Sequence, residues 1–242
     1  MLTQKCSVKS NELGFSLIEM AIVLLIVSTM LGGLLMSLST TREISSRNST
    51  ETTLDEVAEA LYGFAQASGR LPCPATATSN GLEAPVGGGN CTRANGFVPS
   101  ATLGLKGSLN NDNLLMDSWL SAYRYSVSTA LGNAYTSTNF GGRTVAELVN
   151  GADLQVCDEP ACTNVLADDL PAVLLSLGAD WTSFSSTDEV ENSGELVVSG
   201  YRMNNDNIFV STGYIENSFD DILNWVSPSI LISRLIAAGR LP

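Results

Sequence analysis

The chain changes from polar to apolar near its start. Residues 1–14 are polar, whereas apolar residues dominate from 15 to about 38. Residues 20–41 contain no ionisable side chain, and roughly 20 apolar residues in a helix are enough to cross a bilayer core. The pattern therefore predicts a membrane-spanning helix over residues 15–40.

A second helical pattern follows in residues 41–70. Its apolar residues recur at helical spacing: Leu54, Val57, Ala58, Leu61, Phe64 and Ala65. Acidic residues occupy other positions of this segment, so one face is expected to pack against the rest of the chain. Gly69 and Pro72 end the pattern, because glycine favours a helix C-terminus and proline cannot continue a helix. The polar stretch 45–53 is the weakest part of the predicted helix and the place for a break in it.

Residues 71–242 predict a head of mixed helices and strands. A loop rich in Pro, Gly and Asn is expected over residues 71–106. Five short segments between turn-forming residues have the composition of strands: 123–128, 153–157, 172–177, 194–199 and 207–212. Their spacing favours a largely antiparallel sheet packed on the long helix, which makes the expected fold class α+β.

The C-terminal part of the chain is expected to be helical. Residues 218–221 are typical of a capped helix start. Ser227 followed by Pro228 begins a short amphipathic helix that closes at Gly239. Packing against the core accounts for its apolar face, and contact of that face with a partner is the alternative.

Composition and charge exclude several classes of function. The chain has no histidine, which removes Ser-His-Asp and Cys-His catalytic groups and histidine metal sites. The net charge is -13, and residues 151–221 hold fourteen acidic residues against one base, Arg202. Such a surface repels phosphates, so no nucleic-acid partner is expected. No pair of residues in the sequence stands out as a nucleophile with its base or as two catalytic carboxylates, so we expect that the protein is not an enzyme.

One short motif carries most of the functional information. Residues 14–27 read GFSLIEMAIVLLIV, with a single carboxylate, Glu19, inside an apolar run. A carboxylate in such a run needs a cationic partner. The motif resembles the cleavage junction of type IV prepilins and of the pseudopilins of type II secretion. This resemblance implies that a prepilin peptidase cuts between Gly14 and Phe15 and N-methylates Phe15, and that Glu19 pairs with the N-terminal amine of a neighbouring subunit during assembly.

The same resemblance implies a pilin-like architecture. A leader (1–14) would precede a transmembrane or filament-core helix (15–40), the amphipathic second half of that helix (41–70) and a periplasmic α+β head (71–242). The long helix would pack on a small antiparallel sheet, and a short C-terminal helix would complete the head. The protein would cross the inner membrane once before it joins a periplasmic or cell-surface filament.

Partners and function are implied in the same way. The partners would be the membrane, prepilin peptidase, an inner-membrane assembly platform and other pilin or pseudopilin subunits. The processed chain would be larger than typical major subunits, which favours a minor pilin-like subunit of a type IV pilus or a related filament. Three alternatives stay open: a pseudopilin of a type II secretion system, a filament-tip adhesin and a membrane-anchored enzyme. The head also departs from similar proteins, since Leu120 follows Trp119 where a glycine is usual.

The cysteine count fits an exported head. Cys6 lies in the leader, and the processed chain keeps four others: Cys73, Cys91, Cys157 and Cys162. Disulfides persist in the periplasm, so two are expected, with three possible connectivities. The simplest joins the first cysteine to the second and the third to the fourth, each across a short loop. A four-thiolate zinc site is the alternative, although the spacings are unlike those of paired zinc ligands.

Two groups of acidic and amide residues in the head are candidates for a metal site. Residues 180–191 hold one group of acids, and residues 204–207 are rich in Asn and Asp. Oxygen ligands of this kind suit calcium, and the candidates are Asp180, Asp188 and Glu191. Their spacing does not match an EF-hand loop. A solvated acidic surface without any cofactor is therefore the simpler expectation.

Overall fold

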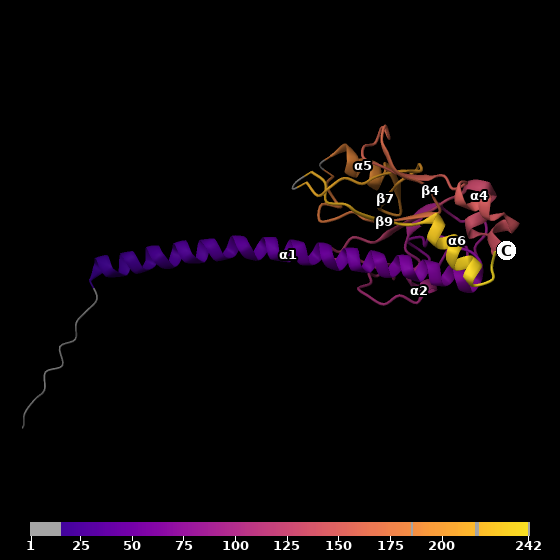
Figure 1. The fold of residues 1–242 in the computed structure, drawn as a ribbon. Coiled ribbons are helices and arrows are strands. Elements are labelled where there is room, and N and C mark those ends of the chain that lie inside the picture. The colour runs from indigo at the N-terminus through magenta and orange to yellow at the C-terminus, as the bar shows by residue number, and fades with distance from the viewer. Residues whose placement is uncertain (1–15, 185, 216–217, 242) are drawn as a thin grey trace, which may run out of the picture. The chain divides into compact units, whose positions relative to one another are not determined.

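The structure, a computed structural model, describes residues 16–184, 186–215 and 218–241, with side chains for all of these except residues 31–40 (Figure 1). The chain divides into two compact units, Met1–Ser45 and Ser46–Pro242. Helix α1, Leu17–Ser68, begins in the first unit and ends in the second. The polar stretch 45–53 does not interrupt it.

The start of α1 is capped by the residue before it. The backbone N–H of Glu19 donates to the hydroxyl of Ser16 at 3.3 Å and to the carbonyl of Ser16 at 3.1 Å. At the other end, Gly69 has a φ of +70° and its N–H donates to the carbonyl of Ala65 at 2.8 Å. Glycine adopts this left-handed conformation without strain, which is why the helix ends there.

The Met1–Ser45 unit is described from Ser16 onward. Its apolar side chains up to residue 30 are exposed, Leu17 by 90% and Leu24 by 68%. Residue 15 and the side chains of residues 31–40, which belong to the predicted membrane span, lie outside the described residues. In the part of the chain that is described, no helix combines the length and the apolar character needed to cross a membrane. The membrane span therefore stays a prediction.

In the Ser46–Pro242 unit, α1 forms the first of three layers. Leu54, Val57, Leu61 and Ala65 share one face of the helix and are at most 1% exposed. Burying a Leu or Val side chain completely contributes about 1.5–3 kcal/mol. This face packs on the central sheet, as the helical pattern predicted.

The central sheet is antiparallel and has the strand order β1-β2-β5-β9. Its strands are β1 (Asn95–Phe97), β2 (Arg124–Val127), β5 (Ala172–Ser176) and β9 (Ile222–Val226). Alternate side chains face opposite sides, so Tyr125 and Leu174 join the α1 core while Val173 and Trp225 face away from it.

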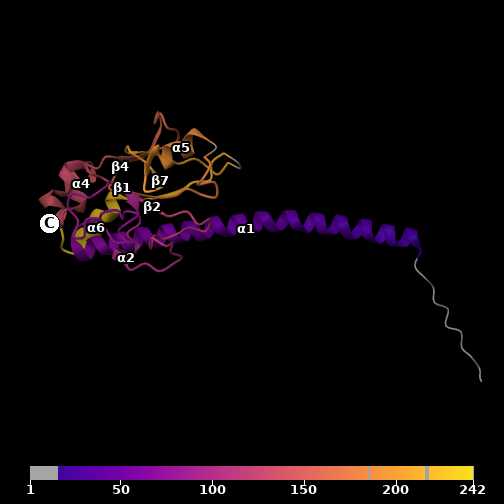
Figure 2. The same cartoon turned by 180° about the vertical axis from the view of Figure 1, so that it is seen from behind.

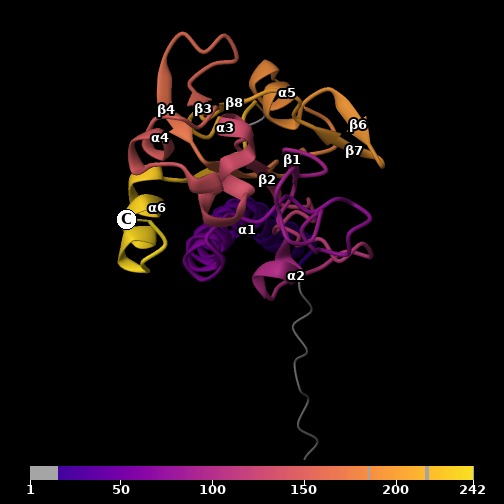
Figure 3. The same cartoon turned by 90° about the vertical axis from the view of Figure 1, so that its right-hand side faces the viewer.

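A second sheet packs on the far face of the central one. It consists of β4 (Val165–Leu170), β3 (Leu154–Cys157) and β8 (Ile208–Val210), in that order. β3 pairs with β4 antiparallel and with β8 parallel. A two-stranded ribbon of β6 (Leu196–Val198) and β7 (Tyr201–Met203) lies on the same side. Figure 3 shows α1 and α2 on one side of β2 and these strands with α5 on the other.

Short helices connect the strands. They are α2 (Ser100–Leu103), α3 (Ala130–Asn133), η1 (Ala134–Thr136), η2 (Thr138–Gly142), α4 (Val145–Val149), α5 (Thr187–Ser193) and α6 (Pro228–Ala237). α6 lies beside the end of α1, as the views from both sides show (Figures 1 and 2). Arg234 of α6 forms an ion pair with Glu59 of α1 at 2.8 Å, and the N–H of Ser227 donates to the hydroxyl of Tyr62 at 2.8 Å.

The α+β class, the five predicted strands and the C-terminal helix are confirmed. The predicted helix start at residues 218–221 is wrong, because β9 begins at Ile222 and pairs along its length with β5. The predicted loop at residues 71–106 contains β1 and α2. The largely antiparallel pairing is confirmed, but the described strands form three separate sheets where one was expected, and β3 pairs parallel with β8. Short segments such as β1 carry no pattern of their own and become strands only beside a partner.

Candidate functional site

The N-terminal processing residues lie at the edge of the described chain. Gly14 and Phe15 are outside the described residues. Glu19 is exposed and stands in the first turn of α1. The unpaired N–H groups of a helix N-terminus favour a nearby negative charge, so this position suits a carboxylate.

The four cysteines of the head form two disulfides. Cys73 pairs with Cys91, with 5.4 Å between their Cα atoms, and Cys157 pairs with Cys162 at 5.1 Å. These are the two pairs that close the shortest loops. The first disulfide ties the loop that follows α1, and the second lies at the end of β3.

A group of acidic side chains forms the candidate metal centre. Asp180 follows β5, Glu189 lies in α5, and Asp220 precedes β9. One carboxylate oxygen from each lies within 4.8 Å of the others. Asp221, the next residue, is only 4% exposed and interacts electrostatically with all three. We call these four residues the carboxylate cluster.

The backbone positions the cluster closely. The carboxylate of Asp220 accepts a hydrogen bond from the N–H of Ala179 at 2.6 Å. Gly178 has a φ of +63°, and a Cβ added there would overlap the Asp220 carboxylate, so glycine is required. Glu189 closes a capping box, in which its N–H donates to the hydroxyl of Ser186 at 3.2 Å. Three separate segments therefore hold the acids at fixed places.

The electrostatics of the cluster are unfavourable without a cation. Burial, and then the charges of Asp220 and Glu189, raise the pKa of Asp180 to about 6. Burial also raises the pKa of Asp220, although Arg47 partly opposes this. The pKa of Asp221 lies well above its ordinary value, mainly through burial and further through the other acids. Like charges crowded into a buried space disfavour ionisation, and a divalent cation removes that cost.

The residues fit a hard cation. One oxygen of Asp221 accepts a hydrogen bond from the amide of Asn192 at 2.7 Å. The other, Oδ1, is buried and has no hydrogen-bond partner among the described residues. A buried carboxylate oxygen normally has a donor or a metal beside it. An all-oxygen set of this charge suits calcium better than softer metals.

The calcium candidates taken from the sequence are only partly brought together. Asp180 lies in the cluster. The carboxylate of Asp188 instead accepts a hydrogen bond from the hydroxyl of Thr187 at 3.3 Å. Glu191 lies beside Asp206, and burial followed by that negative charge raises the pKa of Glu191.

The sequence placed Glu189 in the acidic group of residues 180–191 without choosing it as a ligand, and it did not select Asp220 or Asp221. The signal that places Asp220 near Asp180 is the pairing of β5 with β9, in which Ser176 lies opposite Ile222. In an antiparallel pair, the residues after one strand meet the residues before the other. The two aspartates were instead interpreted as a helix cap, which separated them from Asp180.

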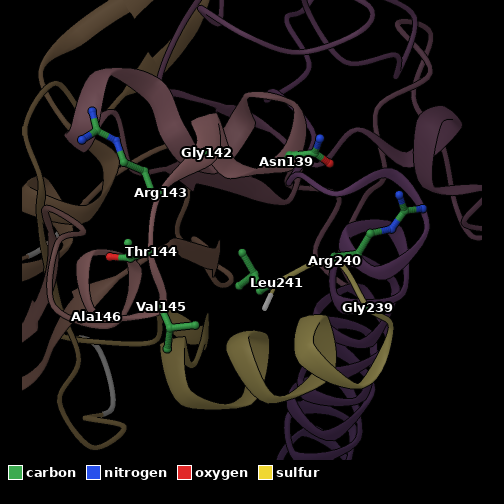
Figure 4. Close-up of a pocket in the computed structure, with 9 residues that line it drawn as sticks. All are labelled: Asn139, Gly142, Arg143, Thr144, Val145, Ala146, Gly239, Arg240 and Leu241. Carbon is green, nitrogen blue, oxygen red and sulfur yellow. The ribbon is translucent and has the colours of Figure 1, made fainter.

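A cavity of about 680 Å³ lies between α4 and the end of the chain (Figure 4). Its two arginines point away from its centre. Arg240 donates to the carbonyl of Gln66 at 2.9 Å, and Arg143 donates to the carbonyl of Leu131 at 3.0 Å. The other lining residues are Asn139, Gly142, Thr144, Val145, Ala146, Gly239 and Leu241. No nucleophile and base converge among these lining residues.

Comparison with known proteins bears on the N-terminus. Residues 9–35 match the family model described as the prokaryotic N-terminal methylation motif. The chain is type IV pilin-like or pseudopilin-like at its N-terminus. The predicted resemblance is thereby confirmed, and the match includes Gly14, Phe15 and Glu19. No curated protein and no solved structure matches this pilin-like chain.

Proposed function

We propose that the protein is a structural subunit of a type IV pilus or a related filament, cleaved after Gly14 and N-methylated on Phe15. The observation that carries the proposal is the methylation motif at residues 9–35. The apolar first part of α1 supports it, because exposed side chains such as Leu17 and Leu24 need an apolar environment. The absence of histidine from the sequence supports a structural rather than a catalytic role.

In the proposed mechanism the membrane holds the subunit through residues 15–40 until assembly. Glu19, near the start of α1, attracts the methylated amine of the neighbouring subunit. That pairing neutralises a carboxylate which is costly to leave alone in an apolar environment. Transfer from the membrane into a bundle of helices keeps the apolar surface covered throughout. The disulfide-bonded head would face the periplasm or the cell exterior.

The first experiment measures the intact mass and the N-terminal sequence of the protein from cells with and without prepilin peptidase. A mature chain that begins at methylated Phe15, only where the peptidase is present, is the expected result. A Glu19→Ala variant should be processed normally and yet fail to enter filaments. A chain that begins at Met1 in both strains would remove the basis of the proposal.

A pseudopilin of a type II secretion system is the runner-up, because the same motif serves both systems. Short periplasmic rods, and loss of protein secretion when the chain is deleted, would favour this role. Surface filaments with intact secretion would favour the pilus. A filament-tip adhesin would require a ligand that the head binds, and no described feature points to one.

We also propose that the carboxylate cluster holds calcium, which would link β5, α5 and the start of β9. All three tryptophans, Trp119, Trp181 and Trp225, lie in the Ser46–Pro242 unit, so their fluorescence reports its unfolding in the full-length protein. Calcium at a hundred times its dissociation constant would stabilise the fold by about 2.7 kcal/mol relative to EDTA.

Two matched variants test the cation site. Asp220→Asn should abolish the calcium-dependent rise in melting temperature, because it removes a cluster carboxylate. Asp188→Asn removes an acid from the same region outside the cluster and should keep the rise. An equal melting temperature in calcium and in EDTA for the unmodified protein would contradict the site.

A further inference from the structure

Acidic residues are concentrated in one layer of the Ser46–Pro242 unit. Residues 151–221 supply β3, β4, α5, β6, β7 and β8, which pack on the face of the central sheet opposite α1 (Figure 3). Among the described residues of this segment, the exposed acids are Glu159, Asp168, Glu195 and Asp206. We call this surface the acidic layer.

Most cations of the same unit already have partners inside the chain. Three arginines form ion pairs: Arg70, Arg143 and Arg234. Three others donate to backbone carbonyls: Arg47, Arg202 and Arg240. Among the described residues of this unit, Arg93 and Lys106 form no ion pair or hydrogen bond, and of these two only Lys106 is exposed.

Lys106 lines a groove on the α1 side of the unit, opposite the acidic layer. The groove has a volume of about 310 Å³, enough for a side chain to enter. Ser49, Thr53 and Glu56 of α1 form one wall, and the hydroxyl-bearing Tyr123 lies at another. Apolar side chains and the buried carboxylate of Asp117 also line it, so the walls are mixed, and Lys106 is the one cation among the lining residues. We call this site the Lys106 groove.

We infer that the Lys106 groove of one copy binds an exposed carboxylate on the acidic layer of a second copy. Copies of a chain with a net charge of -13 repel each other unless their contacts join opposite charges. Lys106 supplies an exposed cation, and the opposite face supplies the carboxylates. A contact between two different faces is heterologous and repeats without closing, which produces an open filament. The inference rests on the proposed function, since it names the surface through which subunits would meet.

The sequence offers a direct chemical test. Once residues 1–14 are removed, Lys106 is the only lysine in the chain. A carbodiimide joins an amine to a carboxylate with loss of water, so its products report almost entirely on Lys106. Filaments sheared from cells, and subunits dispersed in detergent, are treated in parallel and separated on a denaturing gel. The dimer band is then digested, and the joined peptides are identified by mass spectrometry.

The expected result is a dimer from filaments, and not from dispersed subunits, in which Lys106 is joined to an acid within residues 151–221. Lys106→Arg keeps the charge and lacks the reactive amine, so it should form filaments normally and lose the dimer. Lys106→Gln should lower the ratio of filament to membrane-resident subunit by about two- to fivefold, the effect of losing one exposed ion pair per contact.

Several outcomes would overturn the inference. The contact would lie elsewhere if Lys106 is joined to Glu56 of its own chain or to an acid of α1 in a second copy. The same holds if Lys106 is joined to a filament subunit with another sequence. An unchanged filament yield for Lys106→Gln would show that the charge is not used. If the unmodified protein is neither processed nor found in filaments, the proposed function itself fails. Filaments without the Lys106 dimer would remove only the inferred contact.

Discussion

Removal of one buried charge tests how the loop after α1 is held. Glu83 is 4% exposed, and its two carboxylate oxygens each accept a hydrogen bond from Arg70 at 2.7 Å. They also accept the N–H groups of Cys73 at 3.1 Å and of Gly87 at 3.0 Å. Glu83→Gln keeps the shape of the side chain and leaves Arg70 as a buried cation without a carboxylate.

The magnitude follows from this burial. Arg70 is itself only 7% exposed, so water cannot replace the lost charge. Removal of one partner from a buried ion pair costs about 3–5 kcal/mol, because the other charge stays desolvated. Natural domains have a total unfolding free energy of about 5–15 kcal/mol. Glu83→Gln should therefore remove about a fifth or more of the stability of this unit.

The assay is urea unfolding of the full-length protein in mild detergent, followed by tryptophan fluorescence. Glu59→Gln is the matched control, because the ion pair of Glu59 with Arg234 is 61% exposed on the Glu59 side. Exposed pairs contribute about 0–1 kcal/mol. Adding Arg70→Met to Glu83→Gln should recover part of the loss, since it removes the unpaired charge. A loss for Glu83→Gln no larger than that for Glu59→Gln would refute the reasoning.

The same residue predicts a pH dependence. Burial alone raises the pKa of Glu83, but the hydrogen bonds from Arg70, Gly87 and Cys73 outweigh it, so the pKa lies below its ordinary value of 4.5. A lowered pKa in the folded state adds stability above pH 4.5, and that stability is lost as the pH falls through the lowered value. The difference between the unmodified protein and Glu83→Gln should be constant from pH 7 to pH 5 and shrink below that range. A difference that grows on acidification would contradict this sign.

Two further predictions concern the backbone. Leu120 has a φ of +66° and is 65% exposed. Leu120→Gly should therefore raise the unfolding free energy by about 0.5–1 kcal/mol through relief of backbone strain, whereas Leu120→Ala should leave it unchanged. Urea titration of both variants checks this, and equal unfolding free energies for the two variants would contradict it. Replacing Cys73 and Cys91 by serine should cost about 3 kcal/mol against about 2 kcal/mol for Cys157 and Cys162, because the loops span 18 and 5 residues. Calorimetry of the two double variants checks the order, and a larger loss for the shorter loop would show that chain entropy does not decide it.

The sequence alone determined the features that depend on local pattern. The junction at Gly14, Phe15 and Glu19 is contiguous, so its motif could be read without a fold. The buried stripe of α1 follows from apolar residues at helical spacing, and Pro228 marks the start of α6 because its ring fits the first helical turn. The pairing of neighbouring cysteines was favoured by loop length alone.

Only the tertiary structure decided which distant residues meet. Asp180 and Asp220 come together because β5 pairs with β9, and neither segment contains information about its partner. The parallel pairing of β3 with β8 and the burial of Arg70 against Glu83 likewise depend on long-range contacts. A local pattern fixes which face of an element is apolar. Which elements become neighbours is set by packing of the whole unit. That packing brings the residues of the carboxylate cluster together and places the Lys106 groove opposite the acidic layer.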